Sequence, residues 1–209
     1  FFAGSESLVA NNLLLSIFKY VTDPECRQYT LRQAFEESLH NMTIVYICDS
    51  LNLEVSEVYE AYNTIPSIKA KDDFLMQITT DISRNDFTAS TVEGKRELLR
   101  NMISFYIICE GIFFFSGFAM LLSFGRQNKL PGISEQIQYT LRDESLHIEF
   151  GTNLINKIRE QWNLDKPIPV QYFLWLGNLV TLDFGRSFKD NGPVLDKIVE
   201  RVPVTLAMG

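Results

Sequence analysis

Cysteine and positive charge are both scarce in this chain of 209 residues. Its three cysteines, Cys26, Cys48 and Cys109, form no Cys-x-x-Cys pair, which argues against a disulfide framework and a thiolate metal site. Lys and Arg number 19 against 26 Asp and Glu, so the net charge is −7, and no basic cluster is present. We therefore expect neither nucleic acid nor an anionic membrane surface as a partner. No signal-peptide pattern is visible, which predicts a cytoplasmic protein.

Strand-like alternation is also missing, and helical periodicity takes its place. Apolar residues recur at spacings of three and four, which predicts long helices from near the start to 20, and at 24–51, 90–125 and 131–162. Two shorter amphipathic stretches, 55–62 and 68–82, have the character of connecting helices. A capping box at Ser90-x-x-Glu93 and a glycine stop at Gly125 are expected to bound the third long helix.

The composition fits one globular domain, with 46% hydrophobic and 22% charged residues. We predict that this all-α domain spans residues 1–162. Beyond Trp162, prolines and glycines break the pattern, and 172–182 is the one convincing helix there. Residues 163–209 are therefore interpreted as a divergent or incomplete C-terminal segment.

One apolar run, Met102 to Phe124, is long enough to cross a bilayer. Glu110 lies near its centre, where an unpaired carboxylate would be costly in hydrocarbon, and its flanks lack tryptophan and a one-sided basic excess. The better interpretation is a helix in the middle of a bundle, apolar on all sides, and no membrane span.

The chain has only two histidines, and a glutamate precedes each by three residues. Residues three apart share one face of a helix, so each pair can present a carboxylate and an imidazole to the same point. Two further glutamates interrupt the apolar stripes of the other two long helices. The resulting candidate metal ligands are Glu6, Glu37, His40, Glu110, Glu144 and His147.

Each part of this set has an ordinary alternative explanation. A single Glu-x-x-His pair is usually a solvated pair, Glu6 alone could stabilise a first helical turn, and Glu110 alone could pair with a buried Arg or Lys. Taken together, four acids on four apolar stripes would be very costly without compensating charge. Four carboxylates and two imidazoles in this order match the ligands of ferritin-like bundles that hold two adjacent metal ions.

Three strings resemble the small, radical-generating subunit of class I ribonucleotide reductase: Ser5–Asn12, Arg32–His40 and Arg142–His147. The resemblance implies a ferritin-like four-helix bundle with additional connecting helices, and a dinuclear Mn/Fe or Fe/Fe centre. It also implies that this centre activates O₂ and generates the oxidant for radical reduction of ribonucleotides to deoxyribonucleotides in a large (alpha) subunit. A homodimer is expected.

Two departures from the common family pattern matter. Many members carry a radical-bearing tyrosine one turn after the first ligand histidine, where this chain has Ile44. Tyrosyl members usually have aspartate as the first ligand, where this chain has Glu6. Both features resemble the tyrosine-lacking manganese/iron subgroup, although phenylalanine is common there at the position of Ile44.

The resemblance also assigns roles around the ligands. Asp143 matches the acid that hydrogen-bonds His40, and Tyr139 matches a tyrosine implicated in electron delivery, although an ordinary buried tyrosine would give the same pattern. Phe114 and Phe118 match an apolar wall around the oxidant, and core packing explains them equally well.

Two related activities compete with this interpretation. A ligand-binding dimetal oxidase carries a tyrosine five residues before the third-helix glutamate, where this chain has Phe105. A ferritin-like storage protein lacks the long insertion between Leu51 and Ser90. A non-catalytic bundle is the third alternative. No upstream tryptophan and no subunit-docking tail can be matched, so we expect metal binding to survive in this chain but not partnered turnover.

Overall fold

The computed structural model describes residues 1–184 and 193–200, and this part of the chain is helical with no β-strand. The long elements are α1 (Phe2–Leu15), α2 (Pro24–Ser50), α8 (Pro131–Gln161), and a continuous rod formed by α6 (Val92–Ile103), η2 (Ser104–Phe114) and α7 (Phe115–Arg126). The shorter elements are η1 (Ile17–Lys19), α3 (Val55–Tyr59), α4 (Ala61–Thr64), α5 (Pro66–Ser83) and α9 (Ile168–Val180).

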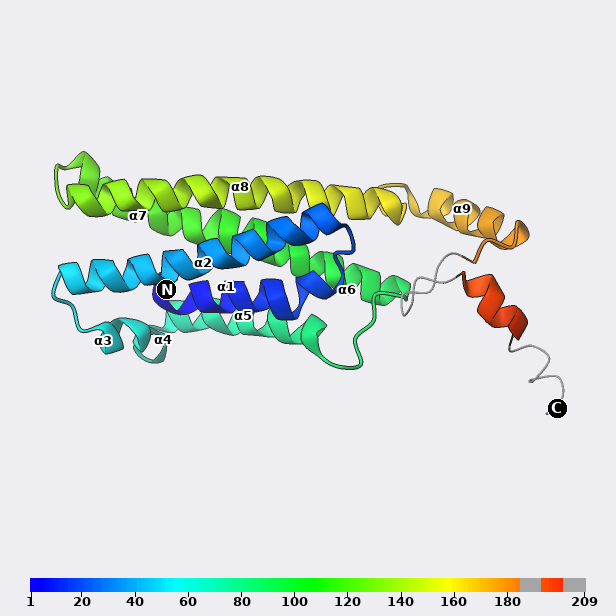
Figure 1. Ribbon diagram of the computed structural model, residues 1–209, viewed down its shortest axis with the longest axis horizontal. Coiled ribbons are helices and arrows are strands. Elements are labelled where there is room, and N and C mark those ends of the chain that lie inside the picture. The colour runs from blue at the N-terminus through cyan, green and yellow to red at the C-terminus, as the bar shows by residue number, and fades with distance from the viewer. Residues whose placement is uncertain (185–192, 201–209) are drawn as a thin grey trace.

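The long helices lie side by side along the long axis of the molecule, and α9 extends beyond one end of them (Figure 1). α1 packs against α2 and α5, while α8 packs against α6, η2 and α7. The expected all-α bundle with additional connecting helices is therefore confirmed.

Local chemistry explains where α2 and α6 begin. Asp23 caps α2 by accepting a hydrogen bond from the Cys26 backbone N–H at 2.9 Å, and a proline follows at the first helical position. The predicted cap of α6 at Ser90 is wrong by one residue. Thr91 Oγ1 accepts from the Gly94 N–H at 3.0 Å, whereas the Ser90 hydroxyl bonds to Thr88 Oγ1 at 2.8 Å.

The predicted stop at Gly125 is also wrong, because α7 continues to Arg126. Asn128, with φ of 57°, takes the left-handed conformation that ends the helix. Leu130 is left-handed as well, with φ of 50°, and directly precedes Pro131 at the start of α8.

Helix η2 is a π-helix of 11 residues, which the sequence pattern did not predict. Its buried side chains follow spacings of four and five, as the wider i to i+5 turn requires: Ser104, Phe105, Tyr106, Cys109, Glu110 and Phe114. π-Helical turns are rare and occur frequently at functional sites. The widened turn is therefore part of how this rod presents Glu110 to the bundle interior.

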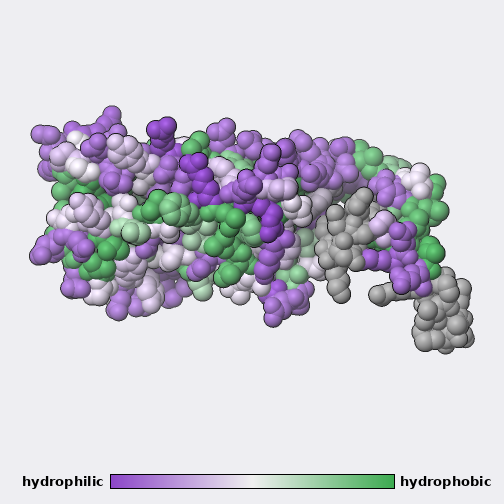
Figure 2. Space-filling view, in the orientation of Figure 1, coloured by the Kyte–Doolittle hydropathy of each residue, from purple (hydrophilic) through white to green (hydrophobic). Residues whose placement is uncertain are grey.

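Exposed apolar side chains gather on the face of the bundle over α1 and α2 (Figure 2). On α2 they include Leu31, Phe35, Leu39 and Met42. α9 has no buried residue. Within the described residues, these apolar side chains are therefore largely exposed to solvent.

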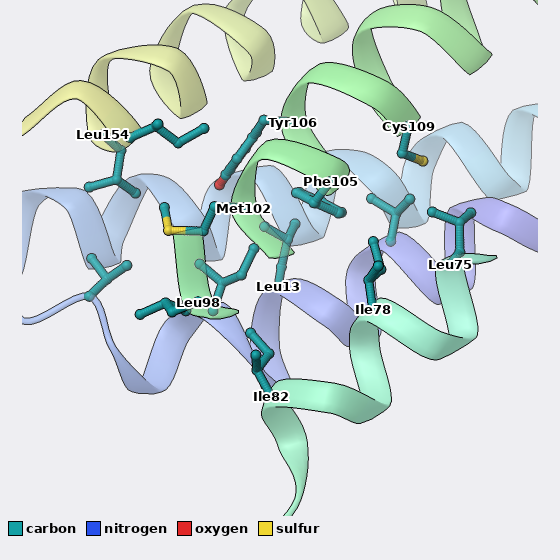
Figure 3. Close-up of a cluster of buried hydrophobic side chains, with 14 of the residues drawn as sticks. Leu13, Leu75, Ile78, Ile82, Leu98, Met102, Phe105, Tyr106, Cys109 and Leu154 are labelled. Carbon is teal, nitrogen blue, oxygen red and sulfur yellow. The ribbon is translucent and has the colours of Figure 1, made fainter. Parts of the chain in front are cut away.

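The apolar core lies between α1, α5, α6, η2 and α8, where side chains from all five elements interdigitate (Figure 3). Tyr106 is completely buried there, and a Cβ atom at Gly151 of α8 would overlap its ring. Glycine is therefore needed at position 151 for η2 and α8 to approach closely.

The rod Val92–Arg126 is long and apolar enough to cross a bilayer, with a mean hydropathy of 2.0 over its most apolar window. One such helix is weak evidence for a membrane span, because a core helix passes the same test. This rod contacts α5 and α8 and carries the buried Glu110, as expected of a bundle helix. The expectation that it lies in the middle of the bundle is wrong, because only 22% of the apolar window is buried.

The expected division at residue 162 stays a prediction. α8 ends at Gln161, next to the proposed boundary, and the C-terminal helix predicted at 172–182 is observed as α9, Ile168–Val180. Residues 185–192 and 201–209 of the predicted C-terminal segment lie outside the described residues.

Candidate metal centre

Six side chains from four helical rods converge in the interior of the bundle. α1 contributes Glu6, α2 contributes Glu37 and His40, η2 contributes Glu110, and α8 contributes Glu144 and His147. All six are buried, with exposed fractions between 0% and 4%. The structure therefore brings together every residue that the sequence analysis predicted as a ligand.

Both imidazoles turn Nδ1 toward the carboxylates. Nδ1 of His40 lies 3.1 Å from Glu144 Oε1, 3.4 Å from Glu37 Oε2 and 4.0 Å from Glu6 Oε2. Nδ1 of His147 lies 3.1 Å from both Glu37 Oε1 and Glu144 Oε2, and 3.8 Å from Glu110 Oε2.

These contacts form two overlapping groups of four ligands. One consists of Glu6, Glu37, His40 and Glu144, the other of Glu37, Glu110, Glu144 and His147, and the ligand atoms of each lie within 4.8 Å of one another. Glu37 and Glu144 belong to both groups, so they are placed to bridge two ions. Each ion would also have one glutamate and one histidine of its own.

Several of these atoms are buried without a hydrogen-bond partner: Glu6 Oε2, both oxygens of Glu37, His40 Nδ1 and Glu144 Oε1. His40 Nδ1 and Glu144 Oε1 are close at 3.1 Å, yet their orientation does not make a hydrogen bond. Buried polar atoms are normally paired, so atoms that face a common point without pairing fit a ligand between them.

The charge balance of the site favours metal ions as that ligand. Among the described residues, no Lys or Arg forms an ion pair with the four carboxylates of the centre, which contact only the two histidines in this way. Two divalent cations carry as much positive charge as four carboxylates carry negative charge. Oxygen and imidazole nitrogen are ligands suited to first-row metal ions.

The pKa values of the ligand side chains in the ion-free cluster also indicate that the site binds positive charge. Burial, and then repulsion by neighbouring carboxylates, raises the pKa of Glu6 and of Glu110 well above the usual range. Burial alone would lower the pKa of His40, but the negative charges of Glu144 and Glu37, in close contact with Nδ1, outweigh it and raise that pKa to about 10.

The pKa of Glu37 is shifted in the opposite direction from those of Glu6 and Glu110. Burial alone would raise its pKa, but the positive charges of His147 and His40, both in close contact with the Glu37 carboxylate, lower it to about 2. The pKa of His147 is raised strongly by Glu144 and Glu37 against the effect of burial. Protons therefore supply the positive charge in the ion-free cluster, and binding of metal ions would release them.

Two acids contact the outer nitrogens of the histidines. Asp143 Oδ2 lies 3.3 Å from His40 Nε2, which is the contact that the family resemblance implied. Glu36 Oε2 lies 3.0 Å from His147 Nε2, and the sequence analysis missed it. The signal was present, because Glu36 precedes Glu37 as Asp143 precedes Glu144.

A second missed residue is Gln33, which lies on the inner stripe of α2 one turn before Glu37. Its Nε2 donates to Glu110 Oε1 and Oε2 at 3.0 and 3.2 Å. The hydroxyl of Tyr106 donates to Gln33 Oε1 at 3.4 Å. The carboxylate of Glu110 is therefore oriented by hydrogen bonds from a fully buried amide.

The remaining predicted residues lie around the centre. Tyr139 is 57% exposed, so the alternative of an ordinary buried tyrosine is wrong. With Asp143 and His40 it lines a surface pocket of about 430 Å³. Phe114 and Phe118 are buried and contact the ring of Phe2, with centroids 5.3 and 5.0 Å from it.

Known proteins that are similar to this chain belong to one family. Residues 1–180 match the family described as ribonucleotide reductase, small chain. The ribonucleoside-diphosphate reductase subunit beta of Chlamydia pneumoniae is 55% identical over 161 residues, covering 77% of this chain and 46% of that protein. The subunit beta of Treponema pallidum is 29% identical over 157 residues, covering 71% of this chain and 40% of that protein.

Among solved structures, a putative class I ribonucleotide reductase from Bacillus halodurans is similar with a TM-score of 0.67 and 23% identity, covering 79% of this chain and 58% of that one. This likeness confirms the ferritin-like fold. The chain spans about half the length of the curated relatives that it matches.

Proposed function

Since the chain belongs to the ribonucleotide reductase small-chain family, we propose that it forms the metal-binding part of the small subunit of a ribonucleoside-diphosphate reductase. In this proposal a dinuclear centre activates O₂ and supplies the oxidant for reduction of ribonucleotides to deoxyribonucleotides. The observation that carries it is the pair of buried four-ligand groups that share Glu37 and Glu144. A large (alpha) subunit would hold the substrate, and a second copy of this chain would complete a dimer.

The proposal assigns the metal ligands residue by residue. Glu6 and His40 would complete one ion, Glu110 and His147 would complete the other, and the two remaining glutamates would bridge them. Supporting this assignment, each histidine faces both bridging carboxylates through Nδ1, at distances between 3.1 and 3.4 Å.

When bound, a redox-active pair such as Mn/Fe or Fe/Fe supplies the electrons for O₂ reduction and stores the oxidising equivalent. The side chains of this chain prepare the site for that chemistry. With an ion bound at Nδ1, each histidine would carry its proton on Nε2, and Asp143 and Glu36 are placed to accept hydrogen bonds from these two Nε2–H groups. Burial of all six ligands keeps bulk water away from them.

A manganese/iron pair is the metal content that we favour. A tyrosine at position 44 could store the oxidising equivalent as a phenoxyl radical, but Ile44 cannot be oxidised in this way. Glu6 in place of an aspartate points to the same tyrosine-lacking subgroup. Tyr139, beside the pocket over His40, would deliver electrons to the centre.

Anaerobic loading tests the centre directly. The metal-free protein is titrated with Mn(II), Fe(II) or both, metal content is measured, and electron paramagnetic resonance spectra are recorded before and after O₂ is admitted. We expect two ions per chain, and a coupled Mn/Fe signal only from the mixed loading followed by O₂.

Matched variants on one helix make the test specific. Glu144→Gln removes a bridging charge and should abolish binding of at least one ion, whereas Glu135→Gln changes an exposed residue of the same helix and should leave two ions bound. A wild-type protein that stays metal-free under every loading would refute the proposal. Assembly as a large hollow shell would favour the storage alternative.

A further inference from the structure

The two histidines are supported by acids in a crossed arrangement. Glu36, which precedes the bridging glutamate of α2, contacts His147 of α8 at 3.0 Å. Asp143, which precedes the bridging glutamate of α8, contacts His40 of α2 at 3.3 Å. Each helix therefore supports the histidine of the other helix.

The two supports differ in rigidity. Arg32, one turn earlier on α2, donates through Nε to Glu36 Oε1 at 2.9 Å, and Glu36 Oε2 faces His147. Rotation of the Glu36 carboxylate would break one of these two contacts. The Glu36 side chain is 13% exposed, compared with 35% for Asp143, and no Lys or Arg forms an ion pair with Asp143 among the described residues.

An imidazole that binds a metal ion through Nδ1 must carry its proton on Nε2. A carboxylate that accepts this proton fixes the tautomer, orients the ring and increases the electron density at the ligating nitrogen. Glu36 occupies the position from which it can do all three for His147, because it touches Nε2 while Nδ1 faces both bridging glutamates at 3.1 Å.

We propose that Glu36, held by Arg32, is a positioning residue that fixes His147 and thereby sets the metal affinity of the Glu110–His147 half of the centre. This inference rests on the dinuclear centre proposed above. It predicts that the two halves respond to different substitutions, the Glu110–His147 half to changes at Glu36 and the other half to changes at Asp143.

The experiment combines a metal titration with a readout of the imidazoles. The protein is labelled with nitrogen-15 histidine and loaded with Zn(II), which is diamagnetic, and its ring nitrogens are observed by nuclear magnetic resonance. The chain has only two histidines, so each ring gives a separate, assignable signal. Calorimetric titration of the same samples gives the number of ions and their affinities.

In the wild type we expect two ions and two rings protonated at Nε2. Glu36→Ala should shift the Nε2 signal of one ring only and weaken one of the two ions by about 10- to 100-fold. Glu36→Gln, whose amide oxygen can still accept the Nε2–H, should recover most of that affinity. Arg32→Ala should shift the same ring by a smaller amount, and Asp143→Ala should shift the other ring.

The outcomes separate this inference from the proposed function. Two ions in the wild type, with both ring signals and both affinities unchanged in the folded Glu36→Ala variant, would overturn the role of Glu36 and leave the metal centre standing. Equal loss in Glu36→Gln and Glu36→Ala would also overturn it. A wild type that binds no ion would overturn the metal centre itself, and this role with it.

Discussion

Replacement of Gln33 by leucine should destabilise the metal-free protein by about 2.5 kcal/mol. Gln33, Glu110 and Tyr106 are fully buried. The Gln33 amide donates to both oxygens of Glu110 at 3.0 and 3.2 Å and accepts from the Tyr106 hydroxyl at 3.4 Å. Leucine fills a similar volume but neither donates nor accepts, so both partners would lose their contact in a place that water does not reach.

The magnitude follows from the two contacts that are lost. A hydrogen bond to a charged group contributes about 1.5–3 kcal/mol, and a buried group left without a partner costs about 1–3 kcal/mol. The low end applies to both, because burial raises the pKa of Glu110 and so favours its uncharged form, and because the contact of Tyr106 is long. The two low ends sum to about 2.5 kcal/mol.

Urea unfolding with a chelator present, followed by circular dichroism, measures this loss. Gln138→Leu is the matched control, because Gln138 is exposed and donates only to the Ser134 carbonyl of its own helix, and its effect should stay within about 0.5 kcal/mol. In a Tyr106→Phe background, the cost of Gln33→Leu should fall by about 1 kcal/mol, since no hydroxyl is left unpaired. A Gln33→Leu variant no less stable than the control would refute the reasoning.

Three further predictions concern packing, pH and metal. Gly151→Val should lower the melting temperature in calorimetry, because a Cβ at Gly151 overlaps the Tyr106 ring and overpacking costs about 1–3 kcal/mol, whereas Gly132→Ala, with no atom within 4 Å of its Cβ, should change it little. The pKa of His40 is raised to about 10, so the stability that protonated His40 gives the folded protein is complete below the ordinary pKa of 6.5 and is lost as pH rises through 10. The pKa of Glu37 is lowered to about 2, so the stability that ionised Glu37 gives the folded protein is present above pH 4.5 and is lost toward pH 2. The raised pKa values of Glu6 and Glu110 act in the opposite sense to that of Glu37, because they cost stability as pH rises above 4.5. Thermal melts of the metal-free protein should therefore show the highest stability near pH 4.5, and an optimum above pH 8 would contradict these shifts. Metal at about 1,000 times its dissociation constant should add about 4 kcal/mol per ion to the unfolding free energy, and a chelator should reverse the gain; an unchanged melting curve would contradict specific binding to the folded state.

Much of the candidate metal centre could be predicted from the spacing of residues close together in the sequence. A glutamate three residues before a histidine must share its helix face, so two such pairs and two acids on apolar stripes predicted the six side chains that converge here. Glu36 and Gln33 were also visible in the sequence, but their partners, His147 and Glu110, lie 111 and 77 residues away. Only the packing of α2 against the other long helices reveals those contacts.

The misplaced boundaries have local causes. Thr91 and Ser90 are both suitable caps, and the choice between them depends on where the Ser90 hydroxyl finds its own partner, Thr88. A glycine at 125 permits a stop without requiring one, and the left-handed conformation is adopted instead at Asn128. The π-helix was not predicted because its four-and-five spacing differs from that of an α-helix by only one residue in each turn.

The burial pattern divides the bundle into an apolar part and a polar part that depends on metal. α1, α5, α6 and η2 supply most of the apolar core, which stabilises them whether or not ions are bound. The buried residues of α2 are mainly polar: Thr30, Gln33, Glu37 and His40, with only Ala34 and Cys48 as apolar members. A helix whose buried face is largely a ligand set gains much of its stabilisation when ions neutralise that face. Occupancy of the centre and the packing of α2 are therefore linked, and through the contact of Glu36 with His147 this link extends to α8.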